Sequence, residues 1–299
     1  MSLRNRLQSA DTSTSYGPDR WLPYRVREIV FRVALYSSAV FIAFIMAFPV
    51  YWMAQNSFKT RAAILEGVSF LPTTATFTLS RYEILFTERV GRYILNSIIV
   101  TSGTVVTVVV LSLIAGYSLA RFRYSGKVHF ARFLLFGYMF SPIVVALPLF
   151  LIWKSLGLLN NPLGAILALS ATAMPFGVWI MWKYLLTIPS AMEESAWIDG
   201  ASRVRGFVDI VLPQTKPALI AVALFAFAVA WNDFTFARIL LPAKEATTFP
   251  PGILALVRQE YSIPWGDVAA AGFFMAVPPL LFAYFLQSYL LKGFEIRQL

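Results

Sequence analysis

Long apolar stretches alternate with short polar connections along almost the whole chain. A helix that crosses a bilayer needs about 20 predominantly apolar residues. The stretches that meet this requirement are Phe31–Ala54, Tyr93–Leu119, Phe130–Trp153, Leu163–Trp182, Pro217–Leu240 and Val268–Leu291. Each is apolar around its whole helical circumference, as expected for helices surrounded by lipid or by other helices. The runs do not alternate as barrel strands would, so the pattern predicts an all-α membrane protein with six transmembrane helices.

One polar block, residues 187–216, separates the fourth and fifth apolar stretches. Ser190 and Glu193 follow Pro189 and predict a helix start in which the two residues cap each other's backbone amides. Gly200 can adopt a positive φ and is expected to end this helix. Apolar residues at helical spacing predict a second short helix: Val204, Phe207, Val208 and Val211. The block is therefore expected to be a helix–turn–helix that docks on a partner at the inner membrane face.

Charge distribution indicates the topology. The chain is 58% hydrophobic and 13% charged, and its net charge is +10. Positive residues cluster in the N-terminal tail and in the connection after the second stretch, whereas the connection at residues 155–162 carries no charged residue. This is the distribution of cytoplasmic and outer loops, so it predicts that both termini are cytoplasmic and argues against nucleic-acid binding. The expected divisions are a tail at 1–28, a six-span domain at 29–291 and a tail at 292–299.

Catalytic and metal-binding patterns are missing from the sequence. It has one histidine, no cysteine and no phosphate-binding Gly-x-x-x-x-Gly-Lys-Ser/Thr motif. Glu193 and Glu194 are adjacent, so on a helix they point about 100° apart and form no facing acid–base pair. We therefore expect a protein that is not an enzyme, and that itself binds no metal and no cofactor.

Two further segments are candidates for contacts with a substrate or a partner. Asp233 is the only carboxylate predicted inside a span, where it either faces a water-filled substrate path or pairs with Arg238. Its neighbours in the candidate path are Trp231 and Asn232. A later apolar segment is too short to span and is interpreted as re-entrant, interfacial or a probe of an external partner; its candidate residues are Pro250, Pro251, Gly252 and Ile253.

The polar block resembles the EAA loop of ATP-binding-cassette (ABC) importer permeases. That loop has the form Glu-Ala-Ala, three residues, Gly, nine residues, Ile-x-Leu-Pro, and here Ser195 replaces the first alanine. The matching residues and their neighbours are Glu193, Glu194, Ser195, Ala196, Asp199, Gly200, Ala201, Phe207, Ile210, Leu212 and Pro213.

The similarity extends over most of the chain and is to the maltose-type carbohydrate permeases, the subunit with six spans. The segments that carry it outside the loop are Phe48-Pro49, Ser57-Phe58-Lys59, Asn96-Ser97, Tyr117-Ser118-Leu119-Ala120-Arg121, Pro175-Phe176 and Trp231-Asn232-Asp233-Phe234. The resemblance implies a type I ABC importer permease fold in a bacterial inner membrane, and a sugar or oligosaccharide substrate.

The same resemblance implies the partners. These are a second permease subunit in a heterodimer, two ATPase subunits that carry ATP and Mg, and an external solute-binding protein. Glu194 would meet a basic residue of the ATPase, and Gly200 would supply the turn. In the maltose system the loop before the last span probes the binding protein, which makes residues 250–261 a candidate contact.

Two other functions stay open on the sequence. One is an ion-coupled secondary transporter with Asp233 as the coupling carboxylate, which would transport without an ATPase. The other is an importer permease for amino acids or phosphate, which the ligand of the binding protein would distinguish from a sugar permease.

Overall fold

The computed structural model describes residues 24–67, 69–85, 87–257 and 265–295. Most of the expected N-terminal tail, the end of the expected C-terminal tail and the later part of the 250–261 candidate contact lie outside these residues. The chain divides into two compact units, residues 1–51 and residues 52–299, and each is described by itself.

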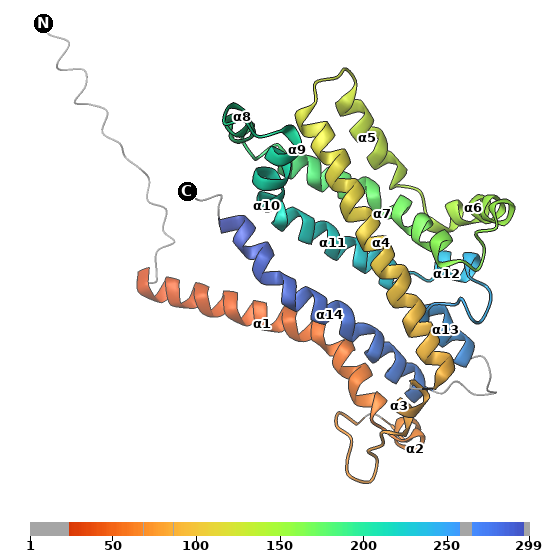
Figure 1. The fold of residues 1–299 in the computed structure, drawn as a ribbon. Coiled ribbons are helices and arrows are strands. Elements are labelled where there is room, and N and C mark those ends of the chain that lie inside the picture. Colours follow the sequence, from red (N-terminus) through yellow and green to blue (C-terminus); the bar gives the residue numbers. More distant parts are fainter. Residues whose placement is uncertain (1–23, 68, 86, 258–264, 296–299) are drawn as a thin grey trace, which may run out of the picture. The chain divides into compact units, whose positions relative to one another are not determined.

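Helices account for nearly all the regular structure of the described residues (Figure 1). The elements are α1 (Tyr24–Ser57), α2 (Arg61–Leu65), α3 (Ser80–Leu85), α4 (Glu88–Arg121), α5 (Lys127–Gly137), α6 (Pro142–Leu156), α7 (Pro162–Leu185), α8 (Ala191–Ile198), α9 (Arg203–Gly206), the π-helix η2 (Phe207–Val211), α10 (Leu212–Gln214), α11 (Lys216–Trp231), α12 (Thr235–Leu240), α13 (Phe249–Val257) and α14 (Trp265–Glu295). Among the described residues, β-structure is limited to an isolated antiparallel bridge between Lys59 and Phe77. The expected all-α class is confirmed.

The long apolar helices agree with four of the expected spans. α1, α4, α7 and α14 are each long and apolar enough to cross a membrane, and the total reaches six if each of two bent helix pairs counts as one span. One bent pair is α5 with α6, at 93°, and the other joins residues 203–214 to α11, at 71°. The spans of this fold are therefore partly broken helices.

The third expected span, residues 130–153, is present as the bent pair of α5 and α6 and is interrupted between them. α5 ends at Gly137 and α6 begins at Pro142. Ser141 has the extended conformation, with φ −61° and ψ 134°, that a residue before proline favours. Pro142 then occupies the first turn of α6, where its missing N–H costs no helical hydrogen bond. The interruption therefore falls at the Ser141-Pro142 step of the sequence.

The fifth expected span also ends early. α11 stops at Trp231, and the separate helix α12 covers the residues from Thr235 to Leu240. Asp233 lies between them and accepts hydrogen bonds from the backbone N–H groups of Phe236 and Ala237, at 3.3 and 2.8 Å. A carboxylate that accepts from the free amides of a helix start stabilises that start. Asp233 thus lies in a helix break, not within a continuous span as predicted.

The core of residues 52–299 is the contact of α4 with α7 and α11. Small residues let these helices pack closely. A Cβ built on Gly116 would lie 2.6 Å from the Met181 Cβ, and one on Gly177 would crowd the Ser112 hydroxyl. Backbones approach this closely only where side chains are absent.

α4 connects two regions of this unit that carry the loop elements (Figure 1). The helix–turn–helix formed by α8, α9, η2 and α10 lies at the C-terminal end of α4, where Tyr117 and Arg121 bond to α8. α13 lies at the other end, where Gly252 packs against the ring of Tyr93. The sites discussed below occupy these two regions.

Candidate functional site

The turn of the helix–turn–helix is built on Gly200. This residue has φ +88° and follows α8. The Gly200 N–H bonds to the Trp197 carbonyl at 3.1 Å, and the Ala201 N–H bonds to the Ala196 carbonyl at 2.9 Å. This pair of bonds is the Schellman closure of a helix end, and it requires a left-handed residue at the glycine position. The predicted role of Gly200 in the turn is confirmed.

The predicted cap at the start of α8 is wrong. The Ser190 side chain makes no capping hydrogen bond, and the Glu193 N–H bonds to the Ser190 carbonyl instead. The Glu193 carboxylate turns away from the helix start toward α4. An arginine and a tyrosine hydroxyl offer this carboxylate two donors, one of them charged, in place of one backbone amide.

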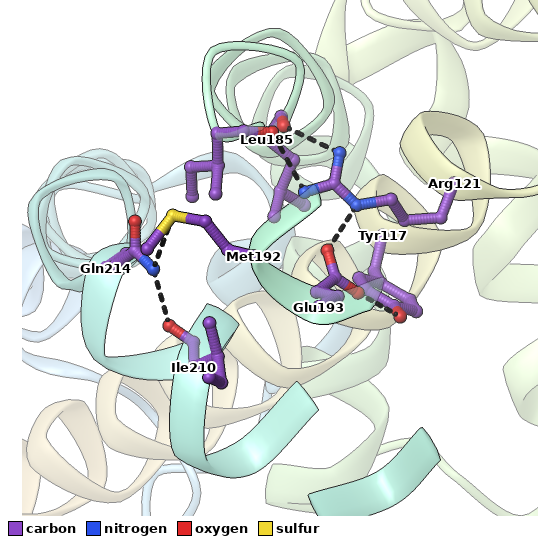
Figure 2. A network of polar contacts seen from close by, with 8 residues as sticks. Tyr117, Arg121, Leu185, Met192, Glu193, Ile210 and Gln214 are labelled. Carbon is purple, nitrogen blue, oxygen red and sulfur yellow. Dashed lines mark hydrogen bonds and ion pairs between the residues drawn. The ribbon is translucent and has the colours of Figure 1, made fainter. Parts of the chain in front are cut away.

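Glu193, Arg121 and Tyr117 form a buried polar network (Figure 2). Arg121 Nε donates to one Glu193 oxygen, and the Tyr117 hydroxyl donates to the other at 2.8 Å. The side chain of Glu193 is 1% exposed and that of Arg121 is 13% exposed. Removing one partner of such a buried pair costs about 3–5 kcal/mol, because the remaining charge is left without compensation.

Arg121 also binds the C-terminal end of α7. Its two terminal nitrogens donate to the carbonyls of Leu185 and Ile188, at 3.2 and 3.0 Å (Figure 2). Carbonyls at the end of a helix lack intrahelical partners, so a guanidinium beside them is favourable. One arginine of α4 therefore joins the end of α7, the connection that follows it and α8.

The second arm of the helix–turn–helix is fixed against the first. The Ser202 hydroxyl accepts from the Arg205 N–H at 3.2 Å and caps α9. The Trp197 ring covers Gly206, where an added Cβ would lie 2.9 Å from the indole nitrogen. The guanidinium of Arg203 lies 4.5 Å from the centre of the same ring. Trp197 therefore packs the first arm against the second.

Contacts at the end of the second arm attach it to α4, α7 and α8. The ring of Phe207 packs edge-on against Tyr117, with centroids 4.8 Å apart. The Gln214 side chain donates to the Ile210 carbonyl at 3.0 Å and lies 3.6 Å from the Met192 sulfur (Figure 2). The Gln214 carbonyl accepts from the Tyr184 hydroxyl of α7 at 3.2 Å. The helix–turn–helix is thus held as a unit against the C-terminal ends of α4 and α7.

Apolar side chains remain exposed on this unit. Ile198 is 86% exposed, Val204 73% and Val208 45%, whereas Val211 is fully buried. The predicted second helix is therefore three short pieces, and of its apolar residues Val204 and Val208 face outward. Glu194 of α8 is exposed as well, one helical turn before Ile198. Exposed apolar side chains together with polar groups are typical of a surface that binds a protein.

The loop residues that carry the motif separate into inward and outward sets. The half-buried or buried ones are Glu193, Ala196, Ala201, Phe207, Ile210 and Leu212, and the exposed ones are Glu194, Ser195, Asp199, Gly200 and Pro213. The outward set leaves the motif's glutamate accessible to a partner.

The three candidate path residues make contacts within the chain. Trp231 is buried and donates its indole N–H to the Met275 carbonyl at 3.0 Å. The Asn232 side chain donates to the Ala228 carbonyl at 2.9 Å. Asp233 accepts hydrogen bonds at the start of α12. Among the described residues, Asp233 and Arg238 do not form an ion pair.

The candidate contact before the last span begins α13. Pro251 and Gly252 are buried, Pro250 and Ile253 are half-buried, and Ile253 packs with Tyr93 near the N-terminal end of α4. Asn96 holds the preceding loop by donating to the carbonyls of Glu245 and Thr247, at 2.8 and 3.0 Å. This start of α13 therefore contributes mainly to packing.

A hollow with a volume of about 610 Å³ lies beside this packing and is lined by charged side chains. Its lining residues are Thr87, Glu88, Arg89, Arg92, Tyr93, Lys244 and Glu245. The five charged residues are exposed, and none belongs to the ion pairs found in the described part of the chain. Their charges are therefore available to a partner.

Sequence reasoning missed the roles of Arg121 and Tyr117. Both were recognised as part of a matching segment, but nothing assigned them to the helix–turn–helix, since Arg121 and Glu193 are 72 positions apart. The available signal was their spacing of four residues, which places both on one face at the end of a span.

Known proteins resemble this chain at the level of family and fold. The model of the family described as binding-protein-dependent transport system inner membrane component matches residues 108–295. The trehalose/maltose transport system permease protein MalG of Thermococcus litoralis is 32% identical over 272 residues, which cover 89% of this chain and 96% of that protein. The diacetylchitobiose uptake system permease protein NgcG of Streptomyces coelicolor is 33% identical over 254 residues, covering 84% and 83%.

A solved structure has the same fold. A chain of a bacterial ABC transporter involved in the import of the acidic polysaccharide alginate superposes with a TM-score of 0.73 and 24% sequence identity. The match covers 90% of this chain and 99% of that chain. At this identity the likeness concerns the fold alone.

Proposed function

The chain belongs to the family of binding-protein-dependent transport system inner membrane components, and we propose that it is the permease subunit of an ABC importer for a sugar or oligosaccharide. The observation that carries this proposal is the helix–turn–helix at the inner end of α4. It is held rigidly by Arg121, Glu193 and Trp197, and it exposes Glu194 together with Ile198. A rigid element with exposed apolar and acidic groups suits docking on a partner.

The partner proposed for this surface is an ATPase subunit. The complete importer would contain this chain, a second permease subunit in a heterodimer, two ATPase subunits and an external solute-binding protein. ATP and Mg are held by the ATPase subunits in this proposal, and their closure drives alternating access of the permeases to the two sides. The chain itself contributes six spans and the helix–turn–helix that docks on the ATPase. It lies in the inner membrane of a bacterial cell, with both termini in the cytoplasm.

Same-side contacts support the proposed topology. The connection before α7 is joined to the connection after α12, because the Asn160 N–H bonds to the Leu240 carbonyl and the Ala243 N–H bonds to the Asn160 side chain, both at 2.8 Å. Arg81 similarly pairs with Asp267 at 2.9 Å. In the proposed topology, both contacts join connections on the outer side.

The binding protein is proposed to dock on the outer side around the charged hollow. Arg89, Arg92 and Lys244 are exposed there with two glutamates. Pro250 to Ile253 would support this surface from beneath, since they are packed against α4. Mixed exposed charges of this kind favour orientation and rapid association over tight binding.

A carbohydrate is the proposed substrate class. This proposal rests on the similar proteins described above, whose names give trehalose or maltose and diacetylchitobiose as their substrates. The path residues Trp231, Asn232 and Asp233 remain proposed as neighbours of the substrate route, with the structural contacts described above.

Reconstitution in liposomes tests the proposed function. The chain is incorporated with its partner permease and ATPases, and uptake of a labelled oligosaccharide is measured with the binding protein outside. We expect uptake only when ATP, ATPases and binding protein are all present. Uptake by this chain alone in an ion gradient would overturn the proposal, and a binding protein that carries an amino acid or phosphate would overturn the substrate class.

A further inference from the structure

α4 is attached to the helix–turn–helix through side chains of a single helical turn. Tyr117 and Arg121 are four residues apart and therefore share a face of α4. Both bond to Glu193 of α8 (Figure 2). The Tyr117 ring also packs against Phe207 of η2. We call Tyr117, Arg121 and Glu193 the clamp.

The covalent chain does not supply this attachment. The helix–turn–helix continues directly from α7 and into α11, whereas α5, α6 and α7 separate it from α4 in the sequence. A displacement of α8 therefore reaches α7 and α11 along the backbone. It reaches the inner end of α4 through contacts such as those of the clamp.

We propose that the clamp makes the inner end of α4 move together with α8 during transport. The proposal rests on the proposed function, in which the ATPase subunits displace the helix–turn–helix. Tyr117, Arg121 and Glu193 are then positioning residues: they touch no substrate, and they determine that α4 follows the docking element.

The chemistry of the clamp suits a connection that must survive a displacement. Both Glu193 oxygens have donors, and the carboxylate is 1% exposed, so separating it from Arg121 would leave a charge buried without a partner. Arg121 also holds the carbonyls of Leu185 and Ile188. The inner ends of α4 and α7 are thereby fixed to α8 at one point.

Packing continues this connection into the membrane. Beyond the clamp, α4 touches α7 where Gly116 meets Met181, a contact with no room for even a methyl group. Two helices in such close contact resist sliding, because protein interiors are packed at the density of crystals. Movement of the clamp would therefore be transmitted to α4 and α7 as a pair.

The first test separates coupling from assembly in the reconstituted importer. Glu193→Gln keeps the size and the acceptor oxygen of the side chain but removes the charge that pairs with Arg121. Its matched control is Glu28→Gln, the same substitution in the exposed pair of Glu28 with Arg32 on α1. We expect Glu193→Gln to retain its partners and ATP hydrolysis while sugar uptake per ATP falls at least about fivefold, the range of a coupling energy between sites. The control should transport as the wild type does.

Tyr117→Phe provides a second variant in case the first fails to fold. It keeps a ring to pack against Phe207 and removes only the hydrogen bond to Glu193. Uptake per ATP should fall, but less than in Glu193→Gln. Normal uptake per ATP in both variants would overturn the proposal, and so would a parallel loss of hydrolysis and uptake, which indicates a structural role alone.

A distance measurement reports the movement itself. The chain has no cysteine, so Ser125→Cys after α4 and Ser190→Cys before α8 place spin labels at two exposed positions of this chain. In otherwise wild-type protein, the distance between the labels should be the same with and without ATP. In Glu193→Gln it should change when ATP binds. A distance that changes in the wild type, or stays constant in Glu193→Gln, would overturn the clamp.

The two proposals fail in different ways. If the wild-type chain assembles with no ATPase and shows no ATP-dependent uptake, the proposed function is wrong. If the wild type transports and the distances contradict the expectation, only the clamp is wrong.

Discussion

Glu193 and Glu194 are consecutive residues of α8, but their carboxylates serve different surfaces. Glu193 is 1% exposed and bonds to Arg121 and Tyr117 of α4. Glu194 is exposed to solvent. Of the two neighbouring acids, Glu193 therefore attaches α8 to α4, and Glu194 is left accessible for the proposed docking on a partner.

Reversing the charge of the outward acid should disrupt docking without unfolding the chain. Glu194→Lys places a positive charge where a basic group of the ATPase is expected, and like charges at an interface cost several kcal/mol. Sugar uptake by the reconstituted importer should be lost. The thermal stability of the purified chain should change by no more than about 0.5 kcal/mol, as for other exposed substitutions. Full uptake would contradict a docking role for Glu194.

A side chain at Gly200 should strain the turn. The glycine has φ +88°, and a Cβ there would meet nothing within 4 Å, so the cost is in the backbone and not in packing. Gly200→Ala should destabilise the helix–turn–helix by about 1–2 kcal/mol, measured as faster hydrogen exchange of the α8 amides. Gly200→Asn is the control, since asparagine tolerates this conformation better. Equal exchange in the two variants would show that the turn does not require a left-handed residue.

A larger side chain at Gly116, where α4 touches α7, should destabilise the fold. In Gly116→Val, the new Cβ would lie 2.6 Å from the Met181 Cβ and 2.9 Å from the Trp182 backbone nitrogen. Overpacking of this kind costs about 1–3 kcal/mol, so the midpoint of thermal unfolding should fall. Gly91→Ala on the same helix is the control, because its Cβ meets nothing within 4 Å and alanine favours the helix by about 0.5–1 kcal/mol. A variant Gly116→Val as stable as the control would be evidence against close packing.

Substitutions of Asp233 distinguish a structural acid from a coupling acid. Asp233→Asn retains one oxygen that can accept from the N–H of Phe236 or of Ala237, whereas Asp233→Ala retains neither acceptor. If the residue holds the start of α12, the asparagine variant should transport normally and the alanine variant should lose about 0.5–2 kcal/mol of stability. An ion-coupled transporter would instead lose transport in Asp233→Asn, so measured uptake decides between the two functions.

The sequence predicts the long helices well and their breaks poorly. Apolar length identified α1, α4, α7 and α14 because burial in lipid imposes that length on any spanning helix. The breaks at residues 138–141 and 232–234 lie within apolar stretches, so apolar length does not reveal them. They depend on a few local residues. Proline alone does not locate a break, because Pro142 begins α6 whereas Pro148 and Pro175 lie inside continuous helices.

In the helix–turn–helix, too, features set by neighbouring residues were predictable and features set by a distant helix were not. The motif spacing was enough to predict the turn at Gly200, because a helix end is determined by a few neighbouring residues. The inward use of Glu193 was not predictable, since it depends on Arg121 arriving from another helix. A local cap with Ser190 was the best available expectation without that partner.

Site-directed cross-linking tests the central claim, that the helix–turn–helix docks on an ATPase. The chain has no cysteine of its own, so Ile198→Cys can carry a thiol-directed photo-crosslinker at a position that is 86% exposed. Leu79→Cys, at a position 56% exposed on the proposed outer side, is the control. In the assembled importer, the probe at residue 198 should attach to an ATPase subunit and the probe at residue 79 should not. A complex that hydrolyses ATP without a cross-link from residue 198, or with one from residue 79, would contradict the account.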